Sequence, residues 1–325
     1  MNAPVDAARA AATPAATCRA ECLALALALA ATGCRADTVR VGSKNFTEGV
    51  LLGEVATRVC GAAGARVEHR RQLGGTTVLW RALHAGSIDA YAEYTGTLTG
   101  ELIRGADPGD LPALRRMLAA QGIVMTAPLG FENTFALGMP ERVAADRGLD
   151  TITDLRAQPD LVFALSHEFL GRADGWPGLS RTYGLTPREV RGVDHDLAYR
   201  ALASGAAHVT DLYSTDAEIA SNHLRALRDD RHYFPDYRAV LLYRADLVAR
   251  SPACARALDA LAAEIEQLLK DPAIAKERAA INAGVLQNVF DGPTRWSLVE
   301  RDWGPDGNLA WLLESIRLAR SSDKL

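Results

Sequence analysis

Residues able to perform acid, base or metal chemistry are present, but their spacing matches no catalytic pattern. The seven His residues show no metal-ligand spacing, and there is no GxSxG elbow, P-loop, HExxH or CxxC motif. Asp211 with Ser214, or Glu93 beside Tyr94, could form acid-base pairs. Ser, Thr and Asp near a strand-to-helix turn, however, more often cap a helix. We therefore predict no catalytic residue, no metal site and no cofactor.

The elements that must position any functional side chain alternate between short β-branched runs and amphipathic stretches. This pattern indicates an α/β protein with mainly parallel sheets. Val39 to Gly42 reads as the first strand, and Asn45 to Glu48 has capping-box spacing ahead of a helix at Val50 to Val59. Further strands are expected at 66–73, 88–91, 135–138, 161–165, 189–193, 208–212 and 239–243, and further helices at 76–85, 111–120, 197–203, 253–269 and 308–318.

Composition is that of an ordinary globular protein. The 325 residues are 48% hydrophobic and 23% charged, which is enough to bury a core in one large or two medium domains. The formal net charge is −4, and no block of Lys or Arg interrupts the chain. Such a chain offers no electrostatic surface for phosphate backbones, so we predict no nucleic-acid partner.

The N-terminal stretch has the character of an export signal. Leu23 to Ala31 is an unbroken Leu/Ala run, too short to span a bilayer, and Thr32, Gly33 and Cys34 follow it. Small residues before a cysteine resemble a bacterial lipobox. Residues 1–33 would then be a lipoprotein-type signal peptide, and Cys34 would be lipidated as the mature N-terminus. The alternative is a buried Ala/Leu helix, and the length of the leader suggests a start codon further downstream.

Two cysteines remain in the body of the chain after the leader. Cys60 and Cys254 could form a disulfide, which an exported protein permits. Two buried free thiols are an equally good interpretation.

Six motifs that follow in order resemble one protein family. Together they resemble the glycine betaine/choline/carnitine-binding proteins of osmoprotectant ABC transporters, over about residues 38–318. The motifs are VGSKNFTE (41–48), LGGT (73–76), YAEYTGT (91–97), RADGWPGL (172–179), YSTD (213–216) and FPDY (234–237).

The resemblance implies a two-lobed type II periplasmic-binding-protein fold, in which two crossing strands join the lobes and the ligand lies between them. Mapped onto this chain, lobe one would be residues 38–131 plus 240–325, and lobe two residues 132–239. The crossings would fall near Asn133 to Gly138 and near Tyr237 to Leu242.

The resemblance also implies a site for a betaine, whose trimethylammonium group cannot donate a hydrogen bond and whose carboxylate must accept several. Aromatic faces suit the first group, and cationic or N–H donors suit the second. The implied ammonium cage is Tyr94, Phe135, Tyr213, Tyr237 and Asn133, and the implied carboxylate clamp is Lys44, Thr97 and Arg172.

Two cage positions depart from the family pattern. Phe135 stands where Tyr is common, so the π-face is kept and a hydroxyl is lost. Asn133 matches a position where relatives can carry Asp, and a neutral amide attracts a cation less strongly. All three clamp residues are retained, which favours a zwitterion over choline.

The resemblance thus predicts a periplasmic, monomeric solute-binding protein, anchored to the membrane through Cys34, that delivers a quaternary-ammonium solute to an ABC permease and its ATPase. Choline, carnitine or another amine is the alternative ligand. An enzyme or a sensory module built on the same scaffold is the alternative function, since a fold alone does not fix function. A sensor would be expected to continue into a transmembrane segment or a DNA-binding domain, and we expect neither here.

Overall fold

The computed structural model describes residues 37–103, 105–107 and 109–270. The expected signal peptide, the lipidation residue Cys34 and the expected helix at 308–318 lie outside these residues. Within them, no helix combines the length and the apolar character that crossing a membrane requires.

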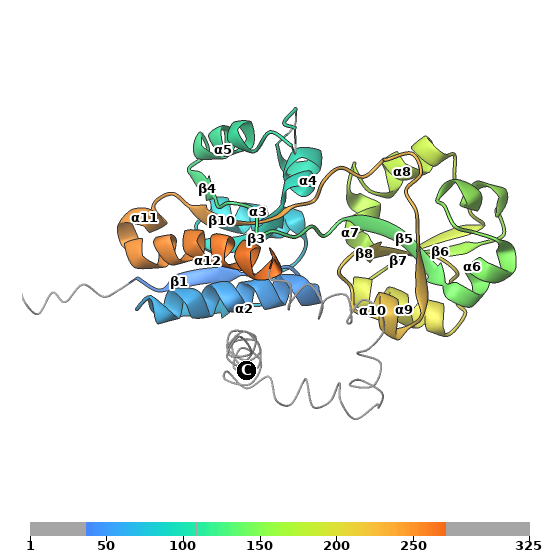
Figure 1. The fold of residues 1–325 in the computed structure, drawn as a ribbon, viewed down its shortest axis with the longest axis horizontal. Coiled ribbons are helices and arrows are strands. Elements are labelled where there is room, and N and C mark those ends of the chain that lie inside the picture. Colours follow the sequence, from blue (N-terminus) through green and yellow to red (C-terminus); the bar gives the residue numbers. More distant parts are fainter. Residues whose placement is uncertain (1–36, 104, 108, 271–325) are drawn as a thin grey trace, which may run out of the picture. The chain divides into compact units, whose positions relative to one another are not determined.

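The first sheet has five strands in the order β2-β1-β3-β10-β4 (Figure 1). Strands β1 and β2 are parallel, as are β1 and β3, whereas β10 runs antiparallel to both β3 and β4. The bounds are β1 Val39–Gly42, β2 Val67–Arg70, β3 Ala90–Tyr94, β4 Ile123–Met125 and β10 Ala239–Arg244.

Both faces of this sheet are covered, which is why every residue of β3 is buried. Side chains of β3 and β10 alternate between two hydrophobic clusters. Tyr91 and Leu242 pack with helices α3 (Thr76–His84) and α5 (Leu111–Ala119), whereas Ala92 and Leu241 belong to the cluster that includes α2 (Thr47–Ala62) and α12 (Pro252–Lys270).

The remaining strands form a second group. Strand β5 lies between β8 and β9 and is antiparallel to both, and β6 pairs in parallel with β7. A parallel bridge between Phe163 and Val209 joins β6 to the segment that leads into β8. The bounds are β5 Phe135–Pro140, β6 Val162–Ser166, β7 Glu189–Val193, β8 Thr210–Tyr213 and β9 Leu224–Leu227.

Short helices complete the described chain and connect these strands. They are α4 Thr95–Thr97, the π-helix η1 Leu98–Leu102, α6 Glu141–Arg147, the 3₁₀-helix η2 Thr153–Ala157, α7 His167–Gly171, α8 Trp176–Tyr183, α9 His195–Ala203, α10 Glu218–Ser221 and α11 Leu247–Arg250.

Two extended segments link the first sheet with the second group of strands and run antiparallel to each other. Glu132 and Arg238 form an antiparallel bridge, and the backbone N–H of Asn133 donates to the backbone carbonyl of Tyr237 over 3.0 Å. These segments coincide with the two crossings that the family resemblance implies.

The prediction of mainly parallel sheets was wrong. Four of the seven strand pairs that the described residues form are antiparallel. Both crossing segments continue directly into a strand, β5 or β10, that inserts between antiparallel neighbours. A period-2 hydrophobic pattern identifies a strand but not its direction.

The capping-box prediction was also wrong. Phe46, not Asn45, is the N-cap residue of α2, which begins at Thr47, and no side chain caps the helix. The Glu48 carboxylate instead accepts hydrogen bonds from Tyr94 and Asn133. Tertiary contacts have replaced the local bond that the spacing suggested.

A disulfide between Cys60 and Cys254 joins helix α2 to helix α12. Both residues are fully buried, and their Cα atoms are 4.4 Å apart. The structure therefore decides between the two interpretations of these cysteines in favour of the bond.

Candidate ligand-binding site

Three residues of the predicted site lie where neighbouring parallel strands of the first sheet end. Lys44 follows β1, Tyr94 is the last residue of β3, and Thr97 ends the short helix α4 that follows. Because the carboxyl ends of parallel strands meet at one edge of a sheet, the three side chains come together there.

The second group of strands contributes the facing residues. Phe135 begins β5 and Tyr213 ends β8, and the two are partners in the antiparallel register. Asn133 and Tyr237 lie on the two crossing segments, and Arg172 follows helix α7.

The structure brings all eight predicted site residues into the wall of a single pocket. The lining residues are Lys44, Asn45, Phe46, Gly75, Thr76, Tyr94, Thr97, Asn133, Phe135, Glu168, Arg172, Tyr213 and Tyr237.

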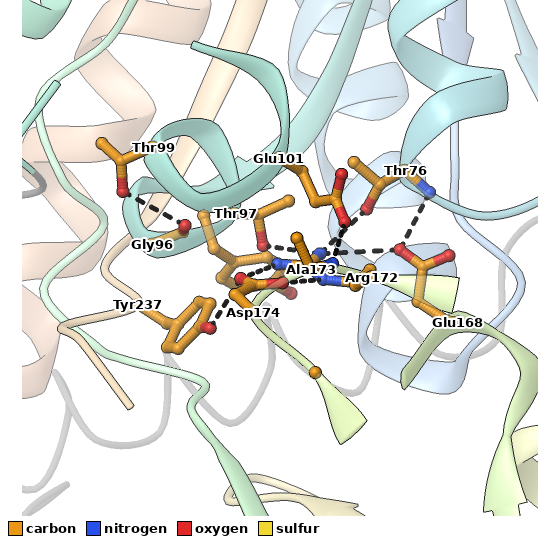
Figure 2. A network of polar contacts seen from close by, with 12 residues as sticks. Thr76, Gly96, Thr97, Thr99, Glu101, Glu168, Arg172, Ala173, Asp174 and Tyr237 are labelled. Atoms are coloured by element: carbon orange, nitrogen blue, oxygen red, sulfur yellow. Dashed lines mark hydrogen bonds and ion pairs between the residues drawn. The ribbon is translucent and has the colours of Figure 1, made fainter. Parts of the chain in front are cut away.

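Arg172 is the centre of a polar network in this wall (Figure 2). Its guanidinium pairs with Asp174, with Nε–Oδ1 and Nη2–Oδ2 distances of 2.8 and 2.5 Å. Nη1 donates to the hydroxyls of Thr97 and Thr76 at 3.2 and 3.3 Å. Burial alone would lower the pKa of Arg172, but the paired Asp174 raises it above its ordinary value. The side chain is therefore a fixed cation.

Lys44 is the second buried cation of the pocket. Its Nζ lies 2.5 Å from Glu93 Oε1 and 2.9 Å from the Thr76 hydroxyl. It also lies 5.5 Å from the centroid of the Tyr94 ring, within cation–π range. Both clamp cations thus have an inner carboxylate partner.

The aromatic residues form a continuous cluster. The Phe135 ring centroid is 5.1 Å from that of Tyr213 and 5.7 Å from that of Tyr237. Phe46 extends the cluster, at 4.8 Å from Tyr213 and 6.4 Å from Tyr94. Sequence reasoning missed Phe46 as a site residue, although it lies within the VGSKNFTE motif.

Glu168 is the second residue of interest that the sequence did not reveal. Its carboxylate accepts from the backbone N–H of Thr76 at 3.2 Å and lies 3.6 Å from Arg172 Nη1. Burial alone would raise the pKa of Glu168, but the charges of Lys44 and Arg172 and the bonds from Thr76 lower it. A usable signal was its place in the first turn of helix α7, directly after the fully buried strand β6.

A buried His lies behind the Tyr213 ring. The rings of His195 and Tyr213 are 4.3 Å apart between centroids, and His195 Nε2 lies 2.9 Å from Asp216 Oδ2. Its Nδ1 lies 3.7 Å from Asp211 Oδ2, an ion-pair distance too long for a hydrogen bond. Burial alone would lower the pKa of His195, but the two carboxylates raise it to about 10.

Ser43, His69 and Glu54 have the bond pattern of a hydrolytic triad. His69 Nε2 lies 3.0 Å from Ser43 Oγ, and His69 Nδ1 lies 2.9 Å from Glu54 Oε2. Ser43 is 2% exposed, does not line the pocket, and accepts from the backbone N–H of Gln72. A substrate has no access to this hydroxyl, so the group braces β1, β2 and α2.

Among the described residues, no three His, Cys, Asp or Glu side chains are grouped so that they could hold a metal ion.

Comparison with known proteins identifies the family. The sequence model described as OpuAC, the substrate-binding domain of ABC-type glycine betaine transport systems, matches residues 37–282. The glycine-betaine-binding protein of Pseudomonas aeruginosa is 33% identical over 246 residues, which is 71% of this chain and 79% of that protein. The carnitine transport binding protein OpuCC of Listeria monocytogenes is 28% identical, over 68% of this chain and 74% of that protein.

A solved structure agrees with these relatives. The crystal structure of a glycine betaine/carnitine/choline ABC transporter protein superposes with a TM-score of 0.55 at 25% identity, covering 77% of this chain and 98% of that one. The fold is thus that of the type II periplasmic binding proteins. This chain belongs to the family of substrate-binding domains of ABC-type glycine betaine transport systems.

Proposed function

We propose that the protein binds glycine betaine, or a closely related quaternary-ammonium compatible solute, and delivers it to an ABC permease and its ATPase. The observation that carries the proposal is that five aromatic side chains, the amide of Asn133 and two buried cations line one pocket. Aromatic faces attract a trimethylammonium group that cannot donate a hydrogen bond. A desolvated ring contributes roughly 0.5 to 2 kcal/mol, so four rings supply much of a micromolar affinity, about −8 kcal/mol.

Recognition of the ligand carboxylate falls to Lys44, Thr97 and Arg172. Arg172 offers a planar pair of N–H donors, which suits a carboxylate better than a single ammonium does. In the part of the chain that the structure describes, its Nη1 contacts the two Thr hydroxyls and, at 3.6 Å, Glu168. Nη1 is therefore the donor that a ligand carboxylate would recruit.

Choline is the second candidate, and it is favoured by the ion pairs that Lys44 and Arg172 already form with carboxylates of the protein. Lys44 and Arg172 each already neutralise an inner carboxylate, Glu93 and Asp174. Glu168 adds a further anion to the wall. A cationic ligand without a carboxylate would meet no electrostatic penalty in such a site.

Calorimetric titration with glycine betaine, proline betaine, carnitine and choline tests both candidates. The proposal requires saturable binding of at least one quaternary amine, with glycine betaine bound more tightly than choline. Tighter binding of choline would reverse the order of the two candidates. Failure of all four to bind would refute the proposal.

We propose that two lobes close over the ligand. Residues 38–131 with residues 240–325 would form one lobe, and residues 132–239 would form the other. The proposed site draws Lys44, Tyr94 and Thr97 from one lobe and Phe135, Arg172 and Tyr213 from the other. Contacts available only in the closed state shift the equilibrium toward it. The radius of gyration from small-angle X-ray scattering should decrease at saturating betaine, and an unchanged value at saturation would refute closure.

As a substrate-binding protein of an ABC importer, the chain acts outside the cytoplasm. We further propose that it is a monomer without catalytic activity and that a lipid on Cys34 anchors it to the membrane. The motif around Cys34 supports the anchor. Cys34→Ala should move the protein from the membrane fraction to the soluble periplasmic fraction, and unchanged partitioning would exclude lipidation.

A further inference from the structure

A partly buried carboxylate lies behind the wall of the pocket without lining it. Glu48, in the first turn of α2, accepts a hydrogen bond from the Tyr94 hydroxyl at 2.5 Å and from Asn133 Nδ2 at 3.1 Å. Tyr94 and Asn133 both line the pocket, whereas Glu48 does not. Glu48 therefore acts on the pocket through two of its wall residues.

Asn133 supplies an independent observation. Its Oδ1 is buried and has no hydrogen-bond partner within the described part of the chain, and the residue is only 4% exposed. Buried acceptors of this kind are rare and call for an explanation. Since Nδ2 is bound to Glu48 and the two amide heteroatoms diverge, Oδ1 points away from Glu48. An unpartnered acceptor in a pocket wall suits a ligand that carries positive charge.

The surroundings of Glu48 set its charge state. Tyr94 faces it from β3, Asn133 from the segment before β5, and Thr215 and Asp216 from the turn after β8. Burial raises the pKa of Glu48 above its ordinary value, and the charge of Asp216 adds to this shift. The three hydrogen bonds from Thr215, Tyr94 and Asn133 oppose the shift without reversing it.

More distant charges complete the surroundings. Asp216 is itself paired with His195, and the Lys44–Glu93 pair lies on the other side of Tyr94. The Lys44–Glu93 pair balances its own charge, whereas Asp211 and Asp216 share His195 and Glu168 is a further anion of the wall. Glu48 differs from these carboxylates because it bonds the side chains of both Tyr94 and Asn133.

We propose that Glu48 is the positioning residue for cation recognition: its carboxylate holds Asn133 with Oδ1 available to the ammonium and supplies the negative charge that the neutral Asn133 lacks. The methyl groups of a quaternary ammonium carry much of its charge and make C–H contacts with such an oxygen. The proposal deepens the proposed function and rests on it.

A link between affinity and pH follows. A bound cation favours ionised Glu48, so binding removes a proton wherever Glu48 is partly protonated in the free protein. Affinity should therefore fall as the pH is lowered through the pKa of Glu48, and it should be constant well above that pKa. Glu48→Gln keeps the size of the side chain but removes its charge. At the separation of a cage wall, this loss should weaken choline binding by about tenfold.

The test is calorimetric titration with choline, whose charge does not change with pH, from about pH 5 to about pH 8. Two buffers of different ionisation enthalpy report the protons released. Wild type should lose affinity and release protons at the acidic end. Glu48→Gln should bind weakly, with neither effect. Glu54→Gln is the matched control, because Glu54 lies on the same helix but pairs with His69, Arg58 and Arg71.

A double variant separates charge from folding. In Glu48→Gln/Asn133→Asp the carboxylate and the amide exchange places, so the hydrogen bond can persist and the negative charge returns to the wall. Recovery of affinity to at least the wild-type value supports the proposal. Failure of the double variant to recover affinity, or a wild-type pH profile in Glu48→Gln, overturns it.

The result for wild type keeps the two proposals distinct. If wild type binds choline or betaine and Glu48→Gln binds equally well, the role of Glu48 is refuted while the proposed function stands. If wild type binds no quaternary amine at any pH, both are refuted.

Discussion

The guanidinium carbon of Arg172 lies 5.3 Å from the centroid of the Phe135 ring. The face that a cage residue should offer to the ligand ammonium is thus in cation–π contact with a clamp residue. Arg172 also bonds Thr97 and Thr76, which belong to the first sheet's side of the pocket. An ammonium group that stacked on the same face of Phe135 would have to displace Arg172, so substitution of Arg172 should affect the two halves of the ligand differently.

Replacing Arg172 with Ala should affect the two ligands differently. The variant loses a donor that only a carboxylate can use, and a charge-assisted hydrogen bond contributes about 1.5 to 3 kcal/mol. Affinity for glycine betaine should fall by roughly tenfold to a hundredfold, whereas affinity for choline should stay the same or increase. Titration calorimetry measures both values.

Arg191→Ala is the control for that experiment, because Arg191 forms an exposed pair with Glu189 outside the pocket. It should change neither affinity. Equal losses of betaine and choline in Arg172→Ala would show that Arg172 holds the two sides of the pocket together rather than the carboxylate. A double variant with Lys44→Ala would then measure the coupling between the two cations.

Truncating a cage ring should weaken every quaternary amine alike. Tyr213 contacts both Phe46 and Phe135, so Tyr213→Ala opens the wall and removes a π-face. Betaine and choline affinities should both fall by about threefold to thirtyfold. Tyr213→Phe keeps the ring and should bind nearly as wild type does, and equal losses in the two variants would assign the effect to the hydroxyl instead.

Six of the eight predicted ligand-binding residues lie within the short ordered motifs, and Asn133 and Phe135 lie outside them. The family resemblance assigned Lys44 and Tyr94 to the site, whereas hydrophobic patterning ended the strand of Tyr94 at Tyr91 rather than at Tyr94. Glu48 was misassigned to a helix cap because spacing cannot reveal that Tyr94 and Asn133, distant in sequence, compete for the same carboxylate.

For a related reason, the hydrophobic pattern of the sequence could not predict the direction of the strands or the ion-pair partners of the charged residues. The antiparallel insertion of β10 beside β3 depends on where a crossing segment enters the sheet, which no local sequence records. Likewise, Arg172 and Lys44 looked like free donors until the structure placed Asp174 and Glu93 against them.

The disulfide should contribute substantially to stability. It closes a loop with a sequence separation of 194 residues between helices that pack on the same sheet. Cys60→Ala/Cys254→Ala should lower the free energy of unfolding by about 2 to 5 kcal/mol, measured by urea denaturation. A reductant should destabilise wild type to the same extent and leave the double variant unchanged. Peptide mapping that recovers both cysteines as free thiols would contradict the bond.

Stability should depend on pH through His195. Its pKa is raised to about 10 in the folded protein, against about 6.5 when unfolded. Because the folded value is the higher one, the contribution is fully present below about pH 6.5 and is lost as the pH rises through about 10. The stability difference between wild type and His195→Gln should narrow over this window, by up to about 1.4 kcal/mol per pH unit. If urea denaturation showed the same stability difference between the two proteins throughout this pH window, an ionised His195 would be excluded.

Recognition of a quaternary ammonium by its charge is the central claim, and a matched pair of ligands tests it most directly. 3,3-Dimethylbutyrate has the shape and carboxylate of glycine betaine but carries carbon in place of the charged nitrogen. In titration calorimetry the protein should bind glycine betaine at least about a hundredfold more tightly than this neutral-headed analogue, because several rings and Glu48 act on the positive charge. Equal affinities would contradict cation recognition and would show a pocket that selects only by shape.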